Sequence, residues 1–215
     1  MTDQIDFTMM YAIHDALRRD LGDLAHSAAA AGDDPARLSA THFGWGLFKS
    51  FLTLHHGTED AVLWPRMREL AAGDSEDLGL IDAMEAEHSR IDPLIAAVED
   101  ALADAEHGHE RLGAVTDELA YQLGAHLSHE ETDGLPLVGR RLPVEDWLRF
   151  GDEQRSRVGL DEASKYLPWL LDGATEERTA GVLQFIPPHL QELYRTAWRG
   201  AYVEANPWAG ERRTV

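Results

Sequence analysis

The chain of 215 residues contains no cysteine. This absence excludes disulfide bonds, thiolate zinc sites, iron–sulfur clusters and cysteine nucleophiles. Basic residues are also scarce, because 19 lysines and arginines face 39 aspartates and glutamates and leave a net charge of −20. Such a surface repels phosphate backbones, so we expect no binding of nucleic acid.

Long apolar runs are missing as well. The sequence has no stretch of about 18 apolar residues, so it predicts no membrane-spanning helix. Residues 1–6 lack the basic and then apolar pattern of a signal peptide, and we therefore expect a cytoplasmic protein without a membrane partner. Hydrophobic residues nevertheless make up 44% of the chain, which is enough to bury a core.

Apolar residues recur at steps of three and four in four successive segments, which predicts four amphipathic helices. The first spans about 6–30, and the second begins near 39–41 and reaches Pro65, which we expect to kink or interrupt it. The third carries an apolar stripe over 81–102 and the fourth a stripe over 112–130. Short connections between such helices are typical of an up-down-up-down four-helix bundle in an all-α protein.

We expect the fourth helix to end at Gly134 and Pro136 and the bundle to occupy residues 1–140. Residues 141–215 are predicted to form a helical C-terminal extension packed on or beside the bundle. This extension holds four of the six tryptophans, which are Trp147, Trp169, Trp198 and Trp208. Tryptophans of this kind act as core or interface anchors, so a homodimer or a partner protein could bind through this extension.

Each of the four stripes contains a histidine where a leucine or isoleucine would otherwise stand. In the second and fourth helices a glutamate follows four residues later, which places the imidazole and the carboxylate on one helix face. The candidate metal ligands are His14, His55, Glu59, His88, His126 and Glu130. In an up-down bundle all six fall near the same end.

The two halves of the predicted bundle repeat one pattern, a histidine followed by His-x-x-x-Glu. His55 and His126 are 71 residues apart (126 − 55), and so are Glu59 and Glu130 (130 − 59). Two such halves would create two metal positions with the glutamates available to bridge them. Burial without partners would cost several kcal/mol per charged group, and a pair of divalent metals removes that cost. Imidazole and carboxylate without thiolate suit iron or manganese and also admit zinc.

Further polar residues flank the stripes, and the sequence leaves their part in the site open. His56 and Asp60 repeat the four-residue spacing one position over, as do His129 and Asp133. We expect these four mainly as outer partners of the ligands or as solvent-facing groups. The alternative is that a member of either pair is itself a ligand.

Two more residues could join the site. Glu85 stands three residues before His88, the Glu-x-x-His spacing of ferritin-like carboxylate sites. Tyr11 lies one turn before His14 and could point at the metals, although ordinary core packing is the simpler interpretation.

The ladder of four histidines and two glutamates resembles the HHE cation-binding family of hemerythrin-like proteins. The segment HHGTEDAVLWP, residues 55–65, is similar to the signature of that family's second helix, and the resemblance covers about 8–137. It implies a four-helix topology and a non-haem centre of two iron ions that deals with oxygen, peroxide or nitric oxide. The segments 168–174 and 193–202 resemble an extension found on some actinobacterial members.

One departure from the oxygen-carrying hemerythrins bears on activity. The resemblance implies an additional histidine on the third helix, one turn before His88, but Met84 stands there with Glu85 beside it. This favours peroxide turnover, oxidation of a small substrate or sensing over reversible oxygen carriage. Three classes stay open: a protein that binds or senses a diatomic ligand, a di-iron oxidase or catalase-like enzyme, and an iron-holding interaction module.

Overall fold

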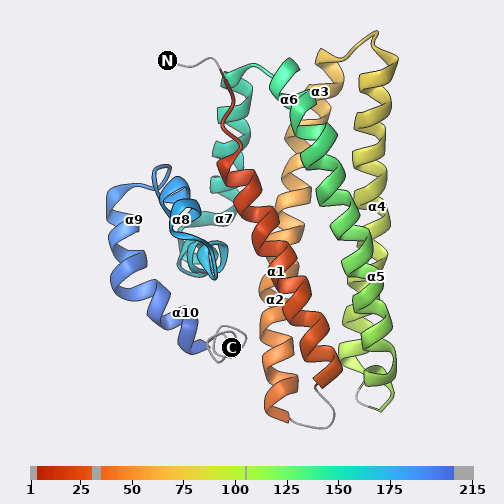
Figure 1. The fold of residues 1–215 in the computed structure, drawn as a ribbon, viewed down its shortest axis with the longest axis vertical. Coiled ribbons are helices and arrows are strands. Elements are labelled where there is room, and N and C mark those ends of the chain that lie inside the picture. The colour runs from red at the N-terminus through yellow and green to blue at the C-terminus, as the bar shows by residue number, and fades with distance from the viewer. Residues whose placement is uncertain (1–3, 31–34, 105, 206–215) are drawn as a thin grey trace. The chain divides into compact units, whose positions relative to one another are not determined.

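The computed structural model describes residues 4–30, 35–104 and 106–205. Within these ranges every regular element is helical, which confirms the predicted all-α class (Figure 1). The elements are α1 (Thr8–Ala30), α2 (Pro35–Thr58), η1 (Glu59–Leu63), α3 (Trp64–Leu70), α4 (Ser75–Ala103), α5 (Gly108–His129), η2 (Glu130–Gly134), α6 (Leu135–Arg141), α7 (Val144–Leu171), α8 (Glu176–Leu183), α9 (Pro188–Leu193), η3 (Tyr194–Trp198) and α10 (Arg199–Ala205). None of the helices in the described ranges combines the length and apolarity needed to cross a membrane.

Contacts divide the chain into two compact units. Unit 1 comprises Met1–Phe7 and Leu52–Arg157, and unit 2 comprises Thr8–Phe51 and Val158–Val215. The predicted division into a bundle over 1–140 and an extension over 141–215 stays a prediction.

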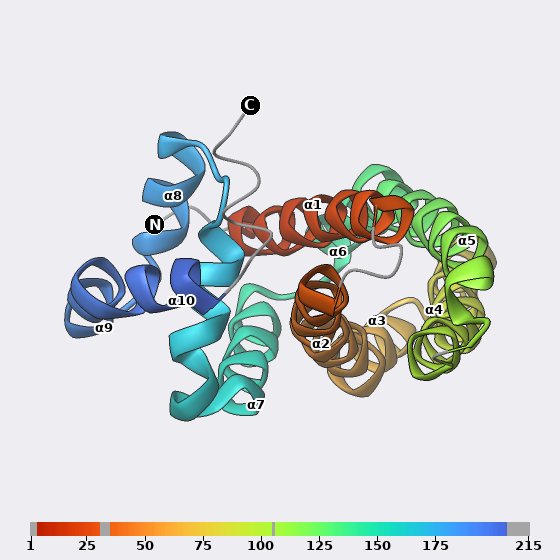
Figure 2. The same ribbon diagram turned by 90° about the horizontal axis from the view of Figure 1, so that it is seen from below.

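The centre of unit 1 is the pair α4 and α5, which run side by side (Figures 1 and 2). Asp74 caps α4, because its side chain accepts a hydrogen bond from the backbone N–H of Asp77. The face that α4 buries follows the predicted apolar stripe as far as Val98 and then ends at Ala101, because Leu102 is only half-buried. This face consists of Ile81, Met84, His88, Ile91, Ile95, Val98 and Ala101. The helix continues through Pro93, which lies on its exposed side.

Helical structure also continues past Pro65 and Pro136. A π-turn replaces one α-helical turn before each proline, so α2 leads through η1 into α3, and α5 leads through η2 into α6. The prediction that the fourth helix ends at Gly134 and Pro136 is therefore wrong. Proline fits near the start of α3 and of α6 because the first turn of a helix requires no N–H donor.

Unit 2 has its own core around Trp169, which is fully buried. The ring centroids of Trp169 and Phe51 lie 4.6 Å apart, and the Nε1–H of Trp169 donates to Asp20 over 2.7 Å. Arg19 donates to the carbonyls of Trp169 and Asp172, both over 2.8 Å, which satisfies backbone groups at the end of α7. Trp169 is thus a core anchor, Trp208 lies outside the described residues, and a partner surface on the extension stays a prediction.

Candidate metal centre

Five of the six predicted ligands lie in unit 1 and are buried there. They are His55, Glu59, His88, His126 and Glu130, and none is more than 3% exposed. His14 is also buried, on α1 in unit 2, so its place in the same site stays a prediction. Fully buried imidazoles and carboxylates are rare without a specific chemical reason.

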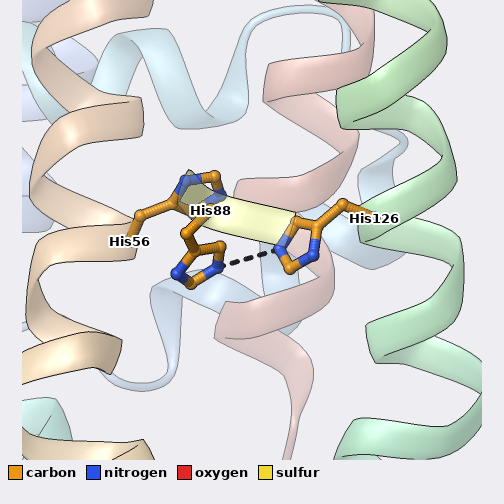
Figure 3. Close-up of side chains that lie close together, drawn as sticks. All are labelled: His56, His88 and His126. Carbon is orange, nitrogen blue, oxygen red and sulfur yellow. Dashed lines mark hydrogen bonds between the residues drawn. The ribbon is translucent and has the colours of Figure 1, made fainter. Parts of the chain in front are cut away.

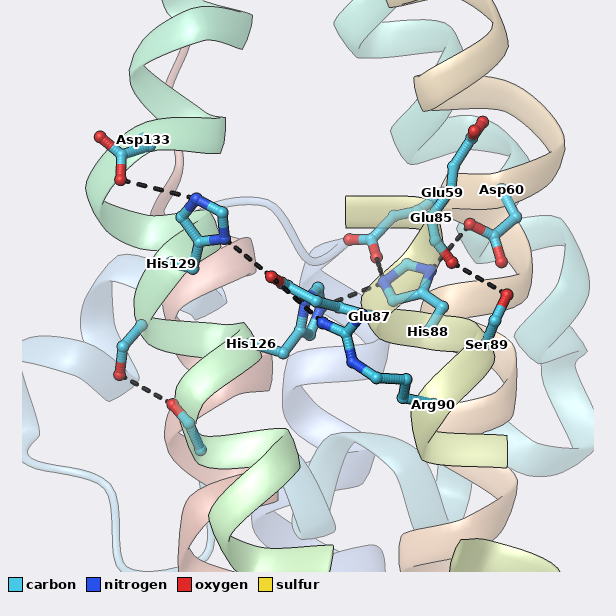
Figure 4. A network of polar contacts seen from close by, with 12 residues as sticks. Glu59, Asp60, Glu85, Glu87, His88, Ser89, Arg90, His126, His129 and Asp133 are labelled. Carbon is cyan, nitrogen blue, oxygen red and sulfur yellow. Dashed lines mark hydrogen bonds and ion pairs between the residues drawn. The ribbon is translucent and has the colours of Figure 1, made fainter. Parts of the chain in front are cut away.

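His88 on α4 and His126 on α5 face each other, with their Nε2 atoms 3.0 Å apart (Figure 3). The opposite nitrogen of each ring meets a carboxylate: Asp60 lies 2.7 Å from Nδ1 of His88, and Glu87 lies 2.9 Å from Nδ1 of His126 (Figure 4). An ionised carboxylate only accepts hydrogen bonds, so it favours the Nδ1–H tautomer and leaves the Nε2 lone pair bare. Two bare lone pairs at this distance repel each other unless a proton or a metal ion lies between them.

A third imidazole belongs to this cluster. The ring of His56 stacks on that of His88, with centroids 3.9 Å apart and planes at 11°, and it meets His126 edge-on at 5.1 Å (Figure 3). One ring nitrogen from each of His56, His88 and His126 lies within 4.8 Å of the other two. His56 is 6% exposed, so the interpretation of this residue as solvent-facing is wrong.

Glu59 connects this cluster to His55. Its carboxylate oxygens lie 3.3 Å from Nδ1 of His55 and 3.7 Å from Nε2 of His88. His55, His56 and Glu59 form a second group whose candidate ligand atoms all lie within 4.8 Å of one another. Neither oxygen of Glu59 accepts a hydrogen bond within the part of the chain that the structure describes. Buried oxygens in this state are suited to a cation.

The pKa shifts of Glu59 and His126 also favour a bound cation. Burial raises the pKa of Glu59 well above 4.5, and the negative charges of Glu130 and Asp60 raise it further. Burial also lowers the pKa of His126, although its hydrogen bond to Glu87 and the charge of Glu130 oppose that shift. The metal-free site therefore favours a protonated carboxyl and a neutral imidazole, and a bound cation would displace the proton and restore the carboxylate. The donor set of imidazole and carboxylate fits iron, manganese or zinc.

Glu87 is a site residue that the sequence pattern did not single out. It accepts hydrogen bonds of 2.9 Å from Nδ1 of His126 and from Nδ1 of His129 (Figure 4). Burial raises its pKa, but these two hydrogen bonds lower it more, and the pKa lies below the ordinary value. Glu87 directly precedes His88 and is therefore off the stripe that defined the candidates. Its partners lie on the neighbouring helix, and spacing within one helix cannot identify such a contact.

The other flanking residues divide into two kinds. Asp60 and His129 are outer partners of the cluster, and His129 is one-third exposed and lies 3.7 Å from Asp133. Glu85 instead forms an ion pair with Arg68 at the surface of α4. The carboxylate beside His88 is therefore that of Asp60.

Tyr11, whose phenol could point at the metals, lies on α1 in unit 2. The centroid of its ring lies 5.9 Å from the guanidinium carbon of Arg178. Its part in the metal site stays a prediction.

Comparison of the chain with known proteins identifies its family. No curated protein and no solved structure matches the chain significantly. A family model, described as the hemerythrin HHE cation binding domain, matches residues 6–138, which include all the candidate ligands and stop short of the extension. Because this match covers more than half of the sequence, the chain belongs to the hemerythrin HHE cation-binding family.

Proposed function

We propose that this chain holds a non-haem centre of two iron ions and handles oxygen, peroxide or nitric oxide there. The proposed ligands are His14, His55, Glu59, His88, His126 and Glu130, and the burial of His56 within the cluster supports the alternative that it is a ligand too. The observation that carries the proposal is the opposed pair of Nε2 atoms on His88 and His126, each aimed inward by a carboxylate on the other side of its ring.

The chain's own residues define what the site can do. Asp60 and Glu87 fix the tautomer of two imidazoles and raise their electron donation, because a hydrogen bond to a carboxylate makes the imidazole more basic. Burial of Glu59 and Glu130 keeps bulk water from the carboxylates. Bound iron would supply electron exchange with a diatomic ligand or a peroxide. Manganese or zinc could occupy the same donors, but zinc would bring no redox chemistry.

Metal analysis tests the proposal directly. Protein reconstituted anaerobically with ferrous iron and then desalted should retain about two iron ions per chain, one for each half of the repeated ligand pattern. On oxidation it should gain near-ultraviolet absorption from oxygen ligands on ferric iron. Protein that retains no iron, manganese or zinc after desalting contradicts the proposal.

An enzyme that consumes peroxide, or oxidises a small substrate, is the second candidate. Met84 occupies the place of the additional histidine in the carrier pattern, and it is fully buried. Asp60 and Glu87 add electron density to His88 and His126, which favours the ferric state. The two functions differ after air exposure: a carrier forms an oxygen adduct that vacuum reverses, whereas the enzyme rests oxidised and turns over hydrogen peroxide faster than free iron does.

A further inference from the structure

Two π-turns stand at equivalent places in the helices of unit 1. η1 begins at Glu59 and η2 begins at Glu130, the two glutamates of the repeated His-x-x-x-Glu pattern. In each, the glutamate carbonyl accepts a hydrogen bond from the residue five positions later, Trp64 or Leu135. The next residue is a proline in both cases. The third described π-turn, η3 in unit 2, begins at Tyr194 and has Gly200 where the other two have proline, so within the described residues the combination with glutamate and proline belongs to the site.

The prolines supply a physical reason for the turns. A regular α-helix would pair the N–H of residue 65 with the carbonyl of Ala61, and the N–H of residue 136 with the carbonyl of Thr132. Pro65 and Pro136 have no N–H, and their rings crowd the carbonyls four residues earlier. A wider turn with an i to i−5 hydrogen bond accommodates the ring and lets the helix continue.

Each π-turn adds one residue to the spacing of the buried face. The residue seven positions before each glutamate is fully buried, and so is the residue eight positions after it, where a regular α-helix would bury the seventh. These residues are Leu52 and Met67 around Glu59, and Leu123 and Val138 around Glu130. In a regular α-helix Val62, three residues after Glu59, would stand on the core face, but Val62 is half-buried and Leu63 takes the core position. Without the extra residue, the helix after each glutamate would be rotated by about 100° relative to the core.

We propose that Pro65 and Pro136 are positioning residues for the metal centre. They fix the two π-turns, and the π-turns aim the Glu59 and Glu130 carboxylates at the metals while α3 and α6 keep their core contacts. This inference rests on the proposed function for the identity of the ligands. At η2 the backbone also makes room for the carboxylate, because a Cβ on Gly134 would lie 3.1 Å from Cγ of Glu130.

The test compares Pro65→Ala and Pro136→Ala with Pro93→Ala. Pro93 is the matched control, because it lies on the exposed side of α4 and no π-turn precedes it there. Hydrogen exchange on the metal-free full chain reports whether the new amide at 65 or 136 forms a bond. Titration with Mn²⁺ and with anaerobic Fe²⁺ reports the affinity, and thermal unfolding reports the fold.

We expect protected new amides and a cooperative thermal unfolding transition in both site variants. Their metal affinity should fall about tenfold or more, as it does when groups that orient ligands are lost. Pro93→Ala should bind metal like the wild type. Protected amides with wild-type affinity overturn the inference, because the turn would then not orient the glutamate. Freely exchanging amides with wild-type affinity also overturn it, because the prolines would then not hold the turn.

Deletion of the exposed Ala61 decides the case if Pro65→Ala fails to fold. The deletion removes the extra residue of η1, so Glu59 and Met67 would stand seven residues apart on one α-helix. We expect a folded chain with weakened metal binding, and a folded deletion variant that binds like the wild type overturns the inference. Failure of the proposed function itself has a different signature, because the wild type would then bind no metal while the new amides still report on the turns.

Discussion

Glu87 on α4 accepts a hydrogen bond of 2.9 Å from Nδ1 of His126 on α5. This contact fixes which imidazole nitrogen is available to a metal. We predict that Glu87→Ala weakens metal affinity about 10- to 100-fold, because His126 loses the partner that holds its tautomer and orientation. Glu87→Gln, whose amide oxygen can still accept, should restore part of the affinity.

The control for this prediction is Glu85→Ala on the same helix. Glu85 pairs with Arg68 at the surface, so its loss should leave metal affinity within about twofold and cost less than about 1 kcal/mol of stability. Mn²⁺ titration monitored by the spin resonance of free Mn²⁺ measures both variants. Equal effects of the two substitutions would contradict the role assigned to Glu87.

Substitutions of His56 and His129 distinguish a residue inside the histidine cluster from one beside it. His56→Ala should remove at least one of two bound metals, because its ring stacks on His88 inside the cluster. His129→Ala should retain most of the metal, since His129 is one-third exposed and contacts Glu87, which in turn contacts His126. Iron content after desalting measures the difference, and the reverse order of effects would refute this arrangement.

Glu59 should make the stability of the metal-free protein depend on pH. Its raised pKa means that between 4.5 and the folded-state value the native chain binds a proton that the unfolded chain has released. Its contribution to stability is therefore full below 4.5 and is lost as the pH rises through the folded-state pKa.

Glu59→Gln should consequently stabilise the metal-free protein at pH 8 by about 1–3 kcal/mol, because it removes the free-energy cost of burying this carboxyl at a pH where the unfolded chain has it ionised. The same variant should be less stable than wild type when metal is added, since a ligand is lost. Urea unfolding at several pH values, with and without Mn²⁺, measures both effects. A destabilised metal-free variant at pH 8 would argue against a buried charge at Glu59.

Gly134 is expected to be intolerant of a side chain. A Cβ there would meet Cγ of Glu130 at 3.1 Å, Sδ of Met84 at 3.5 Å and the ring of Trp64 at 3.6 Å. Gly134→Ala should therefore displace Glu130 and weaken metal binding, with a stability cost of about 1–3 kcal/mol from overpacking. Gly124→Ala on α5 is the control, because a Cβ there meets nothing within 4 Å and alanine favours the helix.

Met84 tests the choice between carrier and enzyme. Met84→His introduces the imidazole that the carrier pattern has on the third helix. We predict slower oxidation of the reduced protein in air and weaker peroxide turnover. The ferric absorption, recorded after the reduced protein is mixed with air or with hydrogen peroxide, measures both rates. Met84→Leu, which conserves volume, should leave both rates near those of the wild type. Equal rates in all three proteins would show that residue 84 does not decide between oxygen carriage and peroxide turnover.

Much of the candidate site was predictable because the candidate ligands obey the geometry of a single helix. His55 and Glu59, like His126 and Glu130, lie four residues apart, and a helix brings such residues to one face regardless of its neighbours. Their burial followed as well, since each replaces an apolar residue in a stripe that must face a core. Family membership could be inferred from the same residues.

Other contacts depended on how α4 and α5 pack together. Glu87 meets His126 and His129 only because the two helices run side by side, and no spacing within one chain segment contains that relation. Glu85, with the better sequence spacing, is drawn away by Arg68 from α3. A side chain on the edge of a stripe can turn to either side, and its neighbours decide which.

The sequence by itself determined the helical class, the repeated pattern and the burial of its histidines and glutamates, because periodicity and residue chemistry are local properties. Only the tertiary structure decided that His56 stacks inside the cluster and that the chain stays helical past Pro65 and Pro136. The stacking joins side chains of two helices, so it depends on how those helices pack. A π-turn shifts the register by one residue, and that shift is stable only where core packing on both sides of the turn compensates for the lost α-helical hydrogen bond.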